Sequence, residues 1–150
     1  MEHHWILDQK ICRFEGRERK MNMSNIKRLS KPLTVDFGGG GKDVFTILQV
    51  TTYESKLHPT AIVLFKDKDD GEETTISVNL EVYFPITEHS KESRHFFVKN
   101  EYGSLVKALQ ESPDFTQVMQ DVPYGNFDAT ASLFEVNLSK LEDIGEESNG

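Results

Sequence analysis

The stretch DVFTILQVTTYE, residues 43–54, has the composition of a long β-strand. β-Branched and aromatic residues fill most of its positions, and such side chains favour extended backbone. Successive side chains of a strand point to opposite faces, and both faces here are apolar, with Phe45 and Ile47 on one and Leu48 and Val50 on or near the other. The stretch therefore predicts a long strand and leaves open whether a bulge interrupts it.

Two further strands are predicted after this one. TAIVLFKD, residues 60–67, begins with an almost unbroken apolar run, which is typical of a strand that is curved or buried on both faces. TTISVNLEVYFPI, residues 74–86, alternates apolar and polar side chains, as a half-buried strand does. Asp70-Gly71 lies between them and favours a tight turn, because glycine tolerates positive φ. The first half of the chain thus predicts a meander of three strands.

The second half changes its period. YGSLVKALQES, residues 102–112, places Leu105, Ala108 and Leu109 on one stripe and predicts a helix. DFTQVMQDV, residues 114–122, predicts a further helical turn with Phe115, Val118 and Met119 facing inward, and HFFVKN (95–100) and 126–138 predict short strands. We therefore expect a mainly β (α+β) fold, a small barrel of about five strands with one helix after the third strand.

Charge divides the chain into parts. The net charge is −8, but residues 1–42 hold nine Lys/Arg and five Asp/Glu, whereas residues 43–150 hold eight and twenty. We predict a flexible N-terminal arm over 1–42, a folded domain over 43–144 and a disordered acidic tail over 145–150. For residues 1–20 two interpretations stay open: an upstream extension before a native start at Met21 or Met23, or a genuine flexible arm.

A run of four glycines followed by Lys42 invites comparison with a phosphate-binding loop. Such a loop needs a glycine where this chain has Asp36, and a Ser/Thr hydroxyl for magnesium where it has Asp43. A predicted strand also follows where the loop needs a helix. The glycines therefore predict a turn or joint leading into the first strand.

Two stretches resemble the closing half of OB-fold proteins from phages and mobile elements: HFFVKNEYGSLVKALQE (95–111) and VPYGNFDATASLFEVNLSKLEDI (122–144). In those proteins a strand leads into a helix with an S-L-x-x-A-L core, followed by a G-x-F-x-A-T strand and a final strand. The resemblance covers about residues 43–144 and implies an OB-like barrel. It also implies a single-stranded-DNA-binding or replication accessory protein, in the cytoplasm of a bacterial host.

Single-stranded DNA is bound by cations together with exposed aromatic rings. The residues that fit this requirement by pattern are Lys42, Tyr53, Lys56, Tyr83, Arg94, Phe97 and Lys99. The alternative is that the aromatic side chains plug the ends of the barrel. The acidity of residues 43–150 argues against non-specific polyanion binding.

A second function uses the acidic side chains. One predicted hairpin tip could dock a basic protein, as nucleic-acid-mimicking inhibitors do, or could simply be a solvated loop; it carries Asp67, Asp69, Asp70, Glu72 and Glu73. A small structural or assembly protein is the third possibility. We expect no enzyme, metal or cofactor, because there is no Gly-x-Ser-x-Gly motif and the five histidines lack metal-binding spacing. No apolar run is long enough for a membrane span, and the single cysteine, Cys12, excludes an internal disulfide.

Overall fold

A computed structural model describes residues 9–11, 26–39, 41–67, 72–84, 93–125 and 128–144. Within these residues the protein is mainly β with one α-helix, which confirms the expected fold class. The elements in chain order are β1 (Ile26–Val35), β2 (Asp43–Thr52), β3 (Thr60–Phe65), β4 (Thr74–Thr75), β5 (Ser93–Lys99), α2 (Gly103–Glu111), β6 (Phe115–Pro123), β7 (Thr130–Asn137), the 3-10 helix η3 (Leu138–Lys140) and β8 (Glu142–Asp143).

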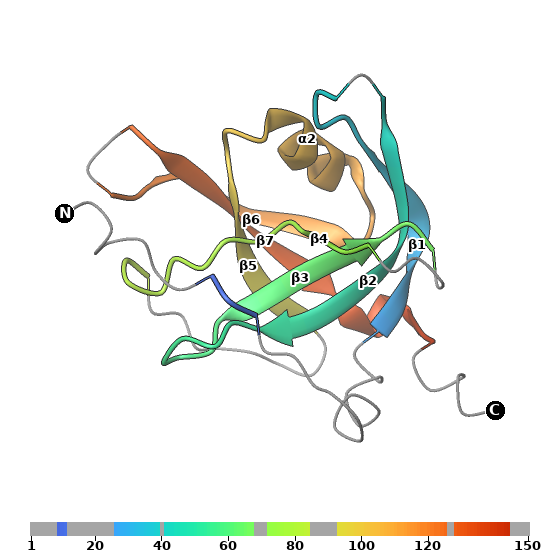
Figure 1. The fold of residues 1–150 in the computed structure, drawn as a ribbon, viewed down its shortest axis with the longest axis horizontal. Coiled ribbons are helices and arrows are strands. Elements are labelled where there is room, and N and C mark those ends of the chain that lie inside the picture. Colours follow the sequence, from blue (N-terminus) through green and yellow to red (C-terminus); the bar gives the residue numbers. More distant parts are fainter. Residues whose placement is uncertain are drawn as a thin grey trace.

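The strands form two antiparallel sheets (Figure 1). One has the order β4-β3-β2-β1-β8 and the other the order β5-β7-β6. Over the described residues the two sheets do not close into one hydrogen-bonded barrel, although an isolated bridge joins Val78 to Phe97. The helix follows β5, so five strands precede it in the described residues, whereas the expected fold had three.

The main core lies between the two sheets and beneath α2. Its buried side chains come from β1, β2 and β3 of the first sheet, from all three strands of the second sheet, and from the helix. Leu105 and Leu109 of α2 are buried and Ala108 packs against the core, which confirms the predicted stripe. Because α2 contacts β1 of one sheet and β6 of the other, it covers the core where the sheets diverge (Figure 1).

The stretch 43–54 forms β2, as predicted. Phe45, Leu48 and Val50 all belong to the main core, which explains why both faces of the stretch are apolar in sequence. The irregularity lies in the partner strand, because the β1–β2 register shifts between Arg28 and Leu33 of β1.

The prediction of a flexible arm is wrong for residues 26–35, which form β1. Leu29, Leu33 and Val35 are buried in the main core, while the residues between Leu29 and Leu33 are exposed. Pro32 lies within the register shift, where the missing N–H of proline breaks no ladder bond. The exposed basic and proline residues of the shift conceal the apolar pattern in the sequence.

The prediction of a strand over residues 74–86 is also wrong for residues 76–84, which follow β4, while residues 85 and 86 lie outside the described residues. Side chains replace part of the ladder here: the Ile76 N–H still donates to the Ile62 carbonyl at 3.0 Å, but the Ile62 N–H donates to the Ser77 hydroxyl at 2.9 Å. The side-chain amide of Gln9 pairs with the main chain of Asn79, accepting its N–H at 2.8 Å and donating to its carbonyl at 3.0 Å. A turn over 81–83 follows, which leaves Val82 54% exposed.

Residues 114–122 form most of β6 rather than a helical turn. Phe115 is buried as predicted, but Val118 and Met119 are 44% and 52% exposed. β6 pairs with β7 along its length, with two register shifts, so the partner strand overrides the local pattern.

Residues Gln9–Ile11 dock on the first sheet. Ile11 is buried with Tyr53, Ala61 and Val63, and the Lys10 carbonyl accepts the Glu54 N–H at 2.8 Å. This part of the N-terminal segment therefore belongs to the folded structure. A native start at Met21 or Met23 stays a prediction, for which the intact mass of the natively expressed protein is the test.

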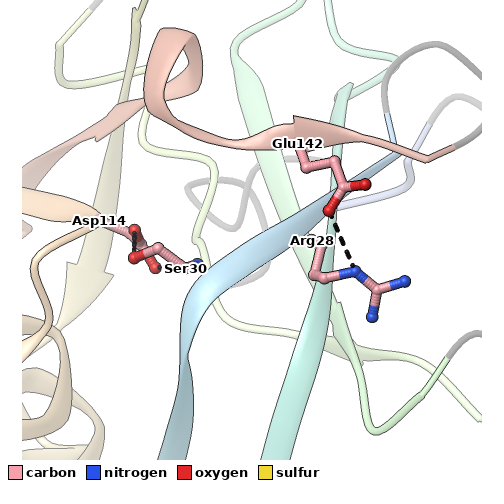
Figure 2. A network of polar contacts seen from close by, with 4 residues as sticks. All are labelled: Arg28, Ser30, Asp114 and Glu142. Atoms are coloured by element: carbon pink, nitrogen blue, oxygen red, sulfur yellow. Dashed lines mark hydrogen bonds and ion pairs between the residues drawn. The ribbon is translucent and has the colours of Figure 1, made fainter.

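A buried carboxylate joins the two sheets (Figure 2). Asp114, just before β6, is 1% exposed and accepts hydrogen bonds from the N–H of Ser30 at 3.0 Å and from its hydroxyl at 2.5 Å. On the same strand β1, Arg28 pairs with Glu142 of β8 at 3.5 Å, and both side chains are exposed. Ser30 lies in the irregular part of β1, so the register shift exposes the N–H that Asp114 binds.

Candidate functional site

A cleft of about 810 Å³ opens where several segments of the chain meet. Its lining comes from Gln9–Ile11, the β1–β2 turn with Phe37, Tyr53 after β2, residues 75–79, the turn with Tyr83, the β5–α2 region, and the connection between β6 and β7. Its volume is in the range of sites that hold small molecules or parts of larger ligands. The cleft is the candidate binding site.

Four aromatic side chains with accessible rings line this cleft. Phe37 and Tyr102 are 43% and 47% exposed, and Tyr83 and Tyr124 are half-buried. The rings of Tyr83 and Tyr124 lie 5.8 Å apart and are tilted by 54°. The cleft therefore offers several rings on which flat ligands can stack.

The fold fixes these rings by different means. Phe37 follows β1 and packs edge-on against the core residue Phe45, with centroids 6.3 Å apart. Tyr83 stands in the turn over 81–83, where its N–H donates to the Leu80 carbonyl at 2.9 Å. Gly125 has φ +76°, and a Cβ there would lie 3.5 Å from the Tyr83 hydroxyl. Glycine suits position 125 because of its positive φ, and the turn after β6 lies against Tyr83 at an ordinary contact distance.

The charge of the cleft lining differs from that of the chain. Among the described residues that line it, Lys10 and Lys99 are cationic and none is acidic, although the whole chain has a net charge of −8. One acidic group outside the lining acts on it: burial raises the pKa of Tyr124, and the charge of Glu101 raises this pKa further. The lining is therefore a basic and aromatic region within an acidic protein.

The polar groups at the floor of the cleft are satisfied by the protein itself. The Tyr53 hydroxyl lies 2.8 Å from the Ser77 hydroxyl, and Tyr53 is only 1% exposed. Burial raises the pKa of Tyr53 to about 12, with the Ser77 hydrogen bond acting in the opposite direction. Tyr53 is therefore a structural tyrosine rather than an exposed ring.

The predicted site residues are divided by the structure. Tyr53, Tyr83 and Lys99 line the cleft. The prediction of an exposed ring is wrong for Tyr53, which is 1% exposed, and for Phe97, which is 8% exposed and whose ring centroid lies 5.3 Å from that of Phe84 in a further core cluster. Both rings are buried because other segments cover them.

The other predicted cations lie outside the cleft. Lys42 and Lys56 are exposed, and Arg94 is half-buried on β5, where its buried Nε has no hydrogen-bond partner among the described residues. Of the acidic tip, Asp69 and Asp70 lie outside the described residues, and Asp67, Glu72 and Glu73 are exposed.

Sequence reasoning missed Phe37, Tyr102 and Tyr124. Each stands beside a glycine: Gly38 in the β1–β2 turn, Gly103 at the start of α2 and Gly125 after β6. An aromatic residue next to a glycine at an element boundary was the available signal, because binding residues concentrate in the connections that a rigid scaffold holds in place.

No protein-family model, curated protein or solved structure matches the chain. Within its described part, no group of three or more His, Cys, Asp or Glu residues is placed to hold a metal ion. No helix in the same part is both long and apolar enough for a transmembrane segment.

Proposed function

We propose that this is a non-enzymatic binding protein that holds single-stranded DNA in the cleft. The observation that carries the proposal is the convergence of four accessible aromatic rings and two lysines on a cleft whose described lining has no acidic residue. Single-stranded nucleic acids are bound by stacking of bases on aromatic side chains, with cations along the backbone. This combination stands out in a chain with a net charge of −8.

The position of the cleft supports the proposal. Phe37 comes from the β1–β2 turn of the first sheet, and Tyr124 and Gly125 follow β6 of the second sheet. Connections from both sheets thus meet at the cleft, and binding residues concentrate in connections that a rigid scaffold holds in place. A replication accessory of a phage or mobile element, acting in the bacterial cytoplasm, is the biological setting we propose.

A titration of a fluorescent oligothymidylate tests the proposal. We expect saturable binding by fluorescence anisotropy at about 50 mM salt, and weaker binding at about 200 mM, because any phosphate contact releases counterions. Absence of binding at the lower salt concentration would refute the proposal. Specific capture of a basic protein instead would favour the alternative function through the acidic tip.

Substitutions locate the site. Tyr102→Ala should weaken binding by about 1–3 kcal/mol through the loss of one stack, and Tyr102→Phe should retain most of the affinity. Val118→Ala is the matched control, since Val118 is 44% exposed on β6 and does not line the cleft. Lys99→Gln should weaken binding, whereas Lys107→Gln, on the exposed side of α2, should not. Equal effects of the cleft and control variants would place the site elsewhere.

A further inference from the structure

We infer that the cleft recognises the bases of the strand and not its phosphates, so that its ligand class is an unpaired, stackable strand whose backbone charge is dispensable. This inference rests on the proposed function and names the chemistry by which the same site would hold its ligand. It follows from the small number of cations, the number of rings and the state of the polar groups in the cleft.

Among the described lining residues the cations are too few for binding through the phosphate backbone. Only Lys10 and Lys99 among the described lining residues are positive, whereas Lys42, Lys56 and Arg94 do not line the cleft. The net charge of −8 gives the whole protein a field that repels a polyanion. Phosphate contacts with this described lining therefore cannot supply most of the affinity. The negative net charge of the protein argues against binding a polyanion through its phosphates, but it is compatible with binding through the bases.

The rings supply an interaction that needs no charge. The cleft is lined by four aromatic residues that are not fully buried: Phe37, Tyr83, Tyr102 and Tyr124. The apolar residues Ile76 and Leu105 line it as well. Base stacking on such rings is tolerant of sequence, because each base has a π-face. With a volume of about 810 Å³, the cleft has room for a few bases rather than a long tract.

The polar groups of the floor are already engaged. The Asn79 side chain donates to the Ser55 hydroxyl at 2.8 Å and accepts the Glu81 N–H at 3.0 Å. The hydroxyls of Tyr53 and Ser77 are paired with each other. Polar groups that already hydrogen-bond within the protein are not available to bind the edges of bases, so the cleft should discriminate weakly between bases.

Three labelled ligands of equal length separate the two sources of affinity. They are oligothymidylate, an abasic DNA with the same phosphates, and a thymine peptide nucleic acid with the same bases on an uncharged backbone. We expect the peptide nucleic acid to bind within about tenfold of the DNA and the abasic strand to bind at least about 100-fold more weakly. We also expect log K for the DNA to fall against log salt with a slope of about −1.4 or shallower, because each of two contacts contributes about −0.7.

The outcomes distinguish this inference from the proposed function. If DNA binds but the peptide nucleic acid does not, or if the slope is steeper than about −3, the inference is wrong while single-stranded-DNA binding stands. If none of the ligands binds, the proposed function fails and the inference with it. Tyr124→Leu should weaken peptide nucleic acid and DNA alike, by about 5- to 150-fold for one lost stack. Lys99→Gln should weaken the binding of DNA only. An equal loss of affinity for DNA and peptide nucleic acid would contradict the assignment of phosphate contact to Lys99 and of base stacking to the rings.

Discussion

The carboxylate of Asp114 binds both the backbone N–H and the hydroxyl of Ser30, a residue that precedes it by 84 positions. It is a buried charged group whose two oxygens each accept a hydrogen bond from the same residue. Since Ser30 belongs to the first sheet and Asp114 leads into the second, this contact fixes the two sheets to each other where no strand ladder joins them.

Asp114→Ala should lower the free energy of unfolding by about 3 kcal/mol. The substitution removes two hydrogen bonds to a charged group and leaves the Ser30 N–H without its partner. Ser30→Ala should cost about 1 kcal/mol, because it removes the hydroxyl and keeps the N–H bond. Urea unfolding measures both, with the exposed Glu111→Ala as a control within about 0.5 kcal/mol of the original protein. Equal stability of the Asp114 and Glu111 variants would show that the junction is dispensable.

Ile11→Asp should release residues 9–11 from the sheet. The new carboxylate would be buried among the apolar side chains of Tyr53, Ala61 and Val63, and burying a charge in such surroundings is costly. When residues 9–11 leave the sheet, amide hydrogen exchange at Glu54 should become faster, because its N–H loses the Lys10 carbonyl to which it donates at 2.8 Å. Val44→Asp is the matched control, since Val44 is 43% exposed on β2. Unchanged exchange at Glu54 would contradict the docking.

Loss of the docked segment should also weaken ligand binding, because Gln9 and Lys10 form part of the cleft wall. The exchange measurement reports docking without any ligand. A variant that undocks and still binds oligothymidylate with full affinity would show that the wall is not needed for the site.

Alkaline pH should destabilise the protein through Tyr53. Its pKa is raised by burial from 10.0 to about 12, so between these values the unfolded phenol loses its proton while the folded one keeps it. The contribution is therefore complete below pH 10 and is lost as the pH rises toward 12, by at most about 3 kcal/mol. The difference in unfolding free energy between the original protein and Tyr53→Phe, followed from pH 9 to pH 12, isolates this effect. A difference that does not change with pH would rule it out.

Gly125→Ala should cost about 1–2 kcal/mol of stability, because a side chain is strained at φ +76°. Its Cβ would lie 3.5 Å from the Tyr83 hydroxyl, which is an ordinary contact distance, so backbone strain sets the cost. Gly38→Ala should cost a similar amount, since φ is +91° there. Gly39→Ala should be neutral, because nothing lies within 4 Å of its Cβ and its φ is not positive. Thermal unfolding measures all three, and equal stability of the three variants would contradict the assignment to strain.

Local patterns were sufficient where a segment decides its own structure. The Leu105–Leu109 stripe gave the position of α2, and the β-branched run from Asp43 gave β2. The glycine run was correctly assigned as a turn, where Asp36 accepts the Gly38 N–H at 2.8 Å. Asp36, which is out of place in a phosphate loop, is thus a residue that shapes the turn.

The candidate site was less predictable, because exposure depends on what other segments cover. Tyr53 and Phe97 have the same local pattern as surface rings, but Ile11 packs over the first and Phe84 over the second. Tyr102 and Tyr124 flank different elements and come together only through the pairing of β6 with β7 and the placement of α2.

The sequence alone determined a mainly β domain, the helix α2, the turn at the glycine run and the absence of a phosphate-loop motif, because periodicity and turn chemistry are local properties. Tertiary structure decided that residues 26–35 are a strand, that Gln9 replaces the ladder at Asn79, and that the lysines and rings of an acidic chain share one cleft. These features depend on contacts between residues tens of positions apart, whose energies have no signature in the neighbouring sequence.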